Sequence, residues 1–315
     1  MTLDKAYVRR PRAESAVTSL TKARLALELT KPAQLALLAF TAYASYLAAG
    51  GPLSPWRLAL LGVVSVGSIG GTVALNMVLE SDIDSIMART SRRPIPSGRM
   101  SRAEGLATAA VLLAAGFAAS ALLNWYVVLA SALALVLDIP VYTVLLKRRT
   151  PWSILFGGLA GVMPVIGGWA AADGSVPPAA IVLAMTVLAW IPIHIWYIVY
   201  YYEDDYRKAS IPMLPVVSTP KRVGALATAS LASMYALYAA YWLLTGKGFL
   251  GLVIGLPLVA FSVRQVRRFS ARKTAGLAAR DEAKAIFRFA NPLLVVLFIF
   301  AVVGYPPLAV LAHYY

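Results

Sequence analysis

Long apolar segments recur through almost the whole chain and limit the folds that it can adopt. The 315 residues are 60% hydrophobic and only 14% charged, whereas soluble domains carry about 25% charged residues. Most of these segments approach the roughly 20 residues that a helix needs to cross the hydrocarbon core of a bilayer, and they lack the ten-residue alternating pattern of a β-barrel. The sequence therefore predicts an all-α membrane protein with about nine transmembrane helices. The predicted spans cover residues 32–50, 57–79, 103–122, 124–146, 152–172, 178–202, 222–244, 248–266 and 287–312.

The basic residues are distributed very unevenly between the segments that join these spans. If the N-terminus lies in the cytoplasm, every lysine and arginine except Arg57 and Lys247 falls on the cytoplasmic side. This bias follows the positive-inside rule, so we expect a multi-pass protein of the cell membrane with its C-terminus outside. The formal net charge of +15 then reflects topology and contact with anionic membrane lipids, and it does not indicate nucleic-acid binding.

The polar parts of the chain indicate how it is organised. Residues 1–31 carry charges throughout and lack the apolar core and cleavage site of a secretory signal, so we expect a basic cytoplasmic arm. Residues 32–315 are expected to form a single transmembrane domain. The other long polar stretches are the predicted cytoplasmic loops 80–102, 203–221 and 267–286, whereas the outer loops are short and nearly uncharged. An active site on this chain should therefore open toward the cytoplasm.

Amide and carboxylate groups gather at the end of the second predicted span. Because side chains four residues apart share a helical face, Asn76, Glu80 and Asp84 form one stripe of oxygen ligands. Asp82 points away from this stripe and is expected to pair with nearby arginines. Oxygen ligands at a membrane edge suit Mg²⁺, which keeps several waters and shares its coordination shell with substrate phosphates. The alternative is a charged loop that only caps the helix, but such a loop would not need an amide and two acids in register.

A second acidic cluster, Glu203-Asp204-Asp205, ends the sixth predicted span. Consecutive acids cannot all share one helical face, so at most one or two point inward, and Asp205 with Tyr201 is the expected inward pair. The cluster is either a second cation site or a solvated helix end. Within the same span lies His194, which is either a proton acceptor or carboxylate partner in a cavity, or a hydrogen-bonded core residue.

These motifs resemble those of the UbiA superfamily of intramembrane prenyltransferases. Within that superfamily the resemblance is closest to the haem branch, the protohaem IX farnesyltransferases or haem O synthases, and it covers about residues 30–220. The block 142–151, the placing of His194 11 residues before Asp205, and the segment 211–217 are similar to the haem branch in particular. The superfamily pattern Asn-x-x-x-Asp-x-x-x-Asp followed by Arg-Thr-x-x-Arg-Pro is matched by Asn76, Glu80, Asp84, Arg89, Thr90, Arg93 and Pro94.

Two positions depart from the superfamily pattern. Glu80 stands where the family usually has aspartate; its longer side chain can still reach a metal, but with altered geometry. The second aspartate-rich motif of the quinone-type members is replaced by Glu203-Asp204-Asp205-Tyr206, a form similar to that of the haem branch. The ligands of a second metal are therefore open.

The resemblance implies nine helices around a central cavity that opens laterally to lipid. It also implies a Mg²⁺-assisted departure of pyrophosphate from a prenyl diphosphate, followed by attack of an electron-rich acceptor on the allylic cation. In the haem branch the acceptor is a vinyl group of protohaem IX, and addition of water gives haem O. Farnesyl diphosphate is the expected donor, geranylgeranyl diphosphate is the alternative, and a haem A synthase or terminal oxidase is the expected downstream partner.

The same resemblance implies roles for individual residues. His194 is placed near the acceptor, where axial ligation of haem is one option. Arginine and lysine side chains can grip phosphate oxygens, and the expected pyrophosphate ligands are Arg89, Arg93, Lys147 and Arg148. The expected metal ligands are Asn76, Glu80 and Asp84 for a first Mg²⁺, and Asp205 with Asp204 for a second.

Other functions compete with transfer to haem. A different UbiA-type prenyltransferase would act on an aromatic acid or a quinone precursor. A carrier of haem or of a prenyl lipid would place its ionisable groups near the midplane, with access from both sides, whereas the acids here lie at one rim. A purely structural membrane subunit would leave the stripe of oxygen ligands unexplained.

Overall fold

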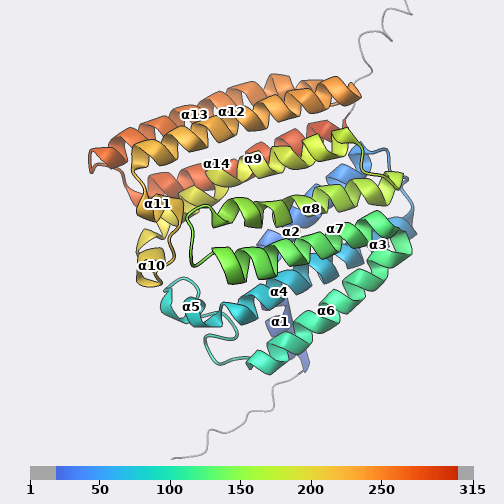
Figure 1. The fold of residues 1–315 in the computed structure, drawn as a ribbon. Helices are drawn as coiled ribbons and strands as arrows, with labels where there is room; N and C mark the ends of the chain where they lie inside the picture. Colours follow the sequence, from blue (N-terminus) through green and yellow to red (C-terminus); the bar gives the residue numbers. More distant parts are fainter. Residues whose placement is uncertain (1–18, 304–315) are drawn as a thin grey trace, which may run out of the picture.

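All regular elements of the described chain are helical. The computed structural model describes residues 19–303. Two elements, η1 and η2, are π-helices that continue the preceding α-helix, and each long apolar helix spans the bundle from end to end (Figure 1). In chain order the elements are α1 (Ser19–Leu29), α2 (Pro32–Ala48), α3 (Pro55–Val64), η1 (Ser65–Ile69), α4 (Gly70–Leu79), α5 (Ser81–Ile86), α6 (Arg102–Leu123), α7 (Trp125–Val136), η2 (Leu137–Leu146), α8 (Ser153–Asp173), α9 (Pro178–Tyr201), α10 (Glu203–Lys208), α11 (Leu214–Val217), α12 (Pro220–Thr245), α13 (Phe249–Thr274) and α14 (Arg280–Val302).

The prediction of an all-α membrane protein is confirmed. Eight helical segments within residues 19–303 are long and apolar enough to cross a membrane. The remaining predicted span, 32–50, corresponds to α2, an apolar helix of 17 residues. Together they give the nine segments that the sequence predicted, whereas the side of the membrane on which each terminus lies stays a prediction.

Helices α13 and α14 extend into the predicted connection 267–286 from both sides. Helix α13 continues to Thr274 instead of ending at 266, and α14 begins at Arg280 instead of 287. The reason is that lysine and arginine are good helix formers, so charge alone does not end a helix. The break comes at Gly276, whose φ of 73° suits glycine at the end of a helix. The basic residues of this region therefore lie on helices.

Helix α9 lies at the centre of one half of the bundle. It packs against α8, α12 and α14, and most of the hydrophobic core that these helices share is buried. Helices α2 and α8 approach each other closely, because a Cβ atom at Gly168 would overlap the carbonyl oxygen of Ala42. A buried hydrogen bond from Ser45 Oγ to the Val165 carbonyl (2.7 Å) joins the same two helices. These contacts fix α2 against α8.

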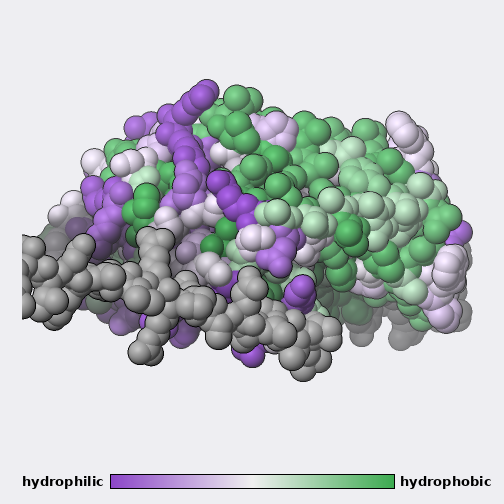
Figure 2. All heavy atoms as spheres, turned by 90° about the horizontal axis from the view of Figure 1, so that it is seen from below, coloured by the Kyte–Doolittle hydropathy of each residue, from purple (hydrophilic) through white to green (hydrophobic). Residues whose placement is uncertain are grey.

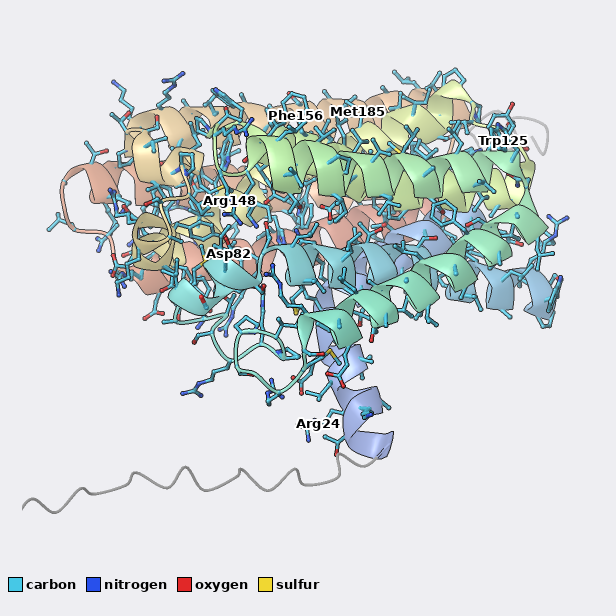
Figure 3. The ribbon with its side chains drawn as sticks, turned by 60° about the horizontal axis from the view of Figure 1, so that its bottom comes forward. Arg24, Asp82, Trp125, Arg148, Phe156 and Met185 are labelled. Atoms are coloured by element: carbon cyan, nitrogen blue, oxygen red, sulfur yellow. The ribbon has the colours of Figure 1, made fainter. Side chains whose placement is uncertain are left out.

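The two ends of the bundle differ in chemistry. The short helices α5, α10 and α11 lie at one end (Figure 1), and the hydrophilic side chains gather at one end of the face drawn in Figure 2, next to a broad apolar band. Exposed apolar side chains on α6 include Val111 and Leu122. An apolar outer surface of this kind suits contact with lipid tails. The predicted site residues that carry charge lie at this polar end, as Asp82 and Arg148 do in Figure 3.

Candidate active site

The stripe of Asn76, Glu80 and Asp84 lies across the junction of α4 and α5. Although α4 ends at Leu79, the backbone N–H of Glu80 donates to Asn76 (3.0 Å) and that of Asp84 donates to Glu80 (2.9 Å). Helical spacing therefore continues through the junction, and the three side chains remain one turn apart. All three are buried, with exposures of 5%, 3% and 4%. Burial of two carboxylates at a membrane edge is costly unless each is paired.

Each side chain of the stripe is paired with a cation. The cations come from three separate parts of the chain: the start of α2, the end of η2 and the loop after α5. The two ion pairs use one oxygen of each carboxylate. The pairs are Lys31 Nζ with Asn76 Oδ1 (3.1 Å), Lys147 Nζ with Glu80 Oε1 (2.5 Å) and Arg93 Nη1 with Asp84 Oδ2 (2.6 Å).

Lys31 is a site residue that the sequence did not reveal. The sequence placed it only at the end of the basic arm, whereas its ammonium group reaches Asn76, which lies 45 residues away. Its φ of 49° is unusual for a residue other than glycine. The pKa of Lys31 is lowered to about 8, chiefly by burial and also by Arg93 and Lys147, while Glu80 and Asp84 oppose the shift. Its position directly before Pro32, at the start of an apolar span, is the only hint that the sequence offers.

The Glu80–Lys147 pair is fully charged despite its burial. Burial raises the pKa of Glu80, but attraction to Lys147 and Lys31 outweighs this effect and leaves the pKa below its usual value. Burial lowers the pKa of Lys147, but Tyr142 and Glu80 outweigh it and leave the pKa above its usual value. Both groups therefore carry charge at neutral pH.

Asp205 joins the second acidic cluster to the first motif. Its buried carboxylate accepts hydrogen bonds from the backbone N–H groups of Ala88 and Arg89, each at 3.2 Å. The Arg89 guanidinium donates to the Tyr206 hydroxyl (3.1 Å) and lies 5.0 Å from the ring centre of Tyr202. The end of α9 and the start of α10 therefore hold the loop that carries Arg89.

The expected pairing of Asp205 with Tyr201 is wrong. The Tyr201 hydroxyl accepts a hydrogen bond from Lys284 of α14 (2.9 Å), and Tyr206 takes its place beside the first motif. The reason is the break at Tyr202, which separates α9 from α10 and changes the helical register. A helix that continued to Asp205 would have kept the two side chains on one face.

The predicted site residues Asp204 and Arg148 lie outside this buried cluster. Asp204 is exposed and pairs with Arg280 (2.5 Å), so neighbouring acids point to different sides, as the sequence predicted. Asp82 is also exposed and accepts two hydrogen bonds from Arg148 (2.8 and 2.9 Å). Those bonds hold the pKa of Asp82 below its usual value. Figure 3 labels Asp82 and Arg148 at the same end of the bundle, opposite Trp125, and the predicted pairing of Asp82 with an arginine is confirmed.

His194 lies deeper in the bundle than the oxygen ligands. It lies seven residues before Tyr201, the last residue of α9, which corresponds to about 10 Å of helical rise. Its ring stacks on Trp190 at 4.3 Å and lies 4.7 Å from the ring of Phe287 on α14. Its polar neighbour is the side chain of Asn291 on α14. The structure thus separates His194 from the charged cluster, and its role beside an acceptor stays a prediction.

The oxygen donors of the stripe fit a magnesium ion that arrives with a phosphorylated ligand. Mg²⁺ is usually held by one or two carboxylates together with waters and substrate phosphates. Within the described part of the chain, no group of three or more histidine, cysteine or acidic side chains is arranged to hold a metal ion by itself. Two carboxylates and one amide oxygen, surrounded by cations, instead match a shared site for a cation and a diphosphate.

Comparison with known proteins assigns the family. The profile of the UbiA prenyltransferase family matches residues 37–291. The chain belongs to this family. A protein from Aeropyrum pernix named protoheme IX farnesyltransferase is 44% identical over 282 residues, which cover 90% of this chain and 92% of that relative. A relative of the same name from Korarchaeum cryptofilum is 42% identical over 272 residues, which cover 86% and 90% of the two chains.

The fold also agrees with a solved structure. The UbiA homolog from Archaeoglobus fulgidus bound to GPP and Mg²⁺ matches with a TM-score of 0.64 and 18% identity, and the match covers 89% of this chain and 100% of that chain. At this identity the match concerns the fold alone. The resemblance to UbiA prenyltransferases is therefore confirmed by the family profile and by the fold.

Proposed function

We propose that this chain transfers a farnesyl group from farnesyl diphosphate to a vinyl group of protohaem IX, with addition of water, to give haem O. The observation that carries the proposal is the 44% identity to a protoheme IX farnesyltransferase over 90% of the chain. The buried cluster of acids and cations at the polar end supports it, because a diphosphate needs both a metal and positive side chains. The site would face the cytoplasm from the cell membrane.

In this proposal Asn76, Glu80 and Asp84 hold a magnesium ion, and Asp205 is the candidate ligand of a second one. Bound Mg²⁺ would neutralise the negative charge that develops on the departing pyrophosphate. Asp204 is not proposed as a ligand in its observed position, because its carboxylate is exposed and paired with Arg280. Asp205 also keeps a positioning role, because it fixes the backbone at Ala88 and Arg89.

The cations of the cluster would exchange one set of partners for another. Lys147 and Arg93 now neutralise the two carboxylates of the stripe, and Lys31 donates to the amide. Once the carboxylates turn to a metal, these cations keep their charge and lie next to the incoming diphosphate. Their side chains are already half-buried beside the stripe, so this proposal needs little further ordering of them.

Arg89 is proposed as a further pyrophosphate ligand. The Tyr206 hydroxyl and the Tyr202 ring restrict its guanidinium, and a fork of fixed orientation suits bidentate binding of phosphate. Arg148 would need to leave Asp82 in order to reach the same ligand. We therefore place Arg89 before Arg148 among the groups that stabilise the leaving pyrophosphate.

The acceptor would lie deeper in the bundle. Departure of pyrophosphate leaves positive charge on the allylic carbons, and the π electrons of a vinyl group attack them to form the new carbon–carbon bond. The positive charge then moves to the haem side chain, where water adds and releases a proton. We propose His194 beside this acceptor, because its ring lies between the aromatic side chains of Trp190 and Phe287, away from the charged cluster.

A panel of acceptors tests the proposal. The full chain, purified in detergent with Mg²⁺ and farnesyl diphosphate, is given haem B, an aromatic acid or a quinone precursor in separate reactions. Mass spectrometry identifies prenylated products, and released pyrophosphate is measured in parallel. We expect prenylation of haem alone. Prenylation of the aromatic acid or quinone precursor would assign the chain to another branch, and no pyrophosphate release with any acceptor would favour a carrier.

A further inference from the structure

A cavity lies between α13 and α14, away from the stripe and its cations. Its volume is about 470 Å³, and none of the proposed metal or pyrophosphate ligands lines it. The apolar part of its lining includes Phe261, Phe269, Ile286 and Phe289. The rings of Phe261 and Phe289 lie 5.0 Å apart, so aromatic side chains from both helices form one wall. The cavity opens to the surface, since Phe261 is 46% exposed.

The rim of this cavity carries positive charge without a partner. Arg272 lines the cavity but pairs with Glu282 at 3.1 Å, so these two charges cancel. Arg268 and Gln265 also line it, and neither side chain has a hydrogen bond or an ion pair within residues 19–303. The cavity therefore combines an aromatic interior with one free guanidinium and one free amide at its edge.

The position of the cavity along α13 matches the layers of a bilayer. Arg268 follows Phe249, the first residue of α13, by about 19 residues, which corresponds to about 28 Å of helical rise. The hydrocarbon core of a bilayer is about 30 Å thick. If Phe249 lies near one boundary, Arg268 lies at the level of the lipid headgroups at the other boundary. Phe261, about 10 Å nearer to the middle of the helix, then lies at the level of the lipid tails.

We propose that this cavity binds one anionic phospholipid of the surrounding membrane. The phosphate would accept hydrogen bonds from Arg268 and Gln265, and one apolar chain would lie against Phe261 and Phe289. Arg264 and Arg267, which are exposed on the same helix, add positive charge around the headgroup. The proposal concerns a site outside the prenyl transfer reaction, and its test does not depend on turnover.

Native mass spectrometry of the full chain in detergent tests this proposal. The chain is stripped of lipid and titrated with phosphatidylglycerol, with phosphatidylcholine of the same chains, and with inorganic phosphate. Arg268→Gln removes the guanidinium that lines the cavity. Arg267→Gln is the matched control, because it removes the same charge from the next position, which is exposed, unpaired and outside the cavity lining.

We expect one phosphatidylglycerol to be retained and phosphatidylcholine to bind much more weakly. Arg268→Gln should lower retention about fivefold, and Arg267→Gln by less than about twofold, because only the first side chain touches the headgroup. Equal losses in both variants would overturn the proposal in favour of a diffuse attraction to charge. Equal retention of phosphatidylcholine, or saturation of the site by inorganic phosphate, would also overturn it.

A second pair of variants tests the apolar half of the site. Ala285 is exposed and lines the cavity, so Ala285→Phe should fill it and lower retention of phosphatidylglycerol. Ala271→Phe adds the same bulk at an exposed position of α13 that does not line the cavity, and it should leave retention unchanged. If Ala285→Phe retained lipid as well as the unchanged chain, the lipid would not occupy this cavity.

Discussion

The neighbouring residues Asp204 and Asp205 allow a sharp test of the proposed site. Asp205 is 7% exposed and accepts two backbone hydrogen bonds, from Ala88 and Arg89. Asp204 has an exposed side chain with a single ion pair to Arg280. Replacement of each by asparagine removes one negative charge from adjacent positions and keeps the size of the side chain. Only the change at Asp205 should disturb the loop that carries Arg89.

The expected size of the effect follows from the two hydrogen bonds. Asparagine at position 205 has one oxygen, so its NH₂ group would face one of the two backbone N–H donors. Hydrogen bonds to charged groups contribute about 1.5 to 3 kcal/mol each, so we expect a loss of about 2 to 3 kcal/mol in positioning the loop. If this whole loss of free energy raises the barrier to the transition state, kcat/KM falls roughly 30- to 150-fold. Loss of a metal ligand at Asp205 would add to it.

The assay is the initial rate of pyrophosphate release by the purified variants with haem and farnesyl diphosphate. Size-exclusion chromatography and circular dichroism would show that each variant is folded. Asp204→Asn should keep its rate within about twofold, because an exposed ion pair contributes little. Equal losses for the two variants, or a larger loss for Asp204→Asn, would refute the reasoning.

Three further changes test other parts of the site and fold. Lys147→Met should lower the free energy of unfolding by roughly 3 kcal/mol or more, because the buried charge of Glu80 loses its partner. Adding Glu80→Gln to this variant removes the unpaired charge and should restore part of the thermal stability. If the double variant were no more stable than Lys147→Met, the pairing would be contradicted. Gly168→Ala should lower the midpoint of thermal unfolding because its Cβ would overlap the backbone of α2, whereas Gly161→Ala, with its nearest neighbour at 3.6 Å, should be tolerated. Chelation of divalent cations should abolish turnover, and added Mg²⁺ should restore it. The Asp84→Asn variant should remain inactive even with Mg²⁺ present. Near-normal activity of that variant would rule out Asp84 as a metal ligand.

The features that the sequence predicted well depend on local patterns. Hydrophobic runs of about 20 residues define spans one at a time, so the nine helices could be located without tertiary information. The stripe of Asn76, Glu80 and Asp84 also depends only on helical spacing, which the backbone hydrogen bonds keep across the α4–α5 junction.

The features that the sequence missed depend on contacts between distant segments. Lys31 reaches Asn76 across 45 residues, and Asp205 reaches Ala88 across 117 residues. No periodic pattern encodes such pairs, because they form only when separate helices pack. The end of α13 and the start of α14 were missed for another reason. Arginine and lysine mark the membrane edge but also favour helix, so both helices extend beyond their apolar runs.

The oxygen atom that enters the haem product provides the most direct test of the proposed reaction. The full chain would react with haem B, farnesyl diphosphate and Mg²⁺ in water enriched in ¹⁸O, and the haem fraction would be examined by mass spectrometry. The account predicts a haem that has gained one farnesyl group and one hydroxyl group labelled with ¹⁸O. Unmodified haem, or a farnesylated haem without oxygen from water, would contradict it.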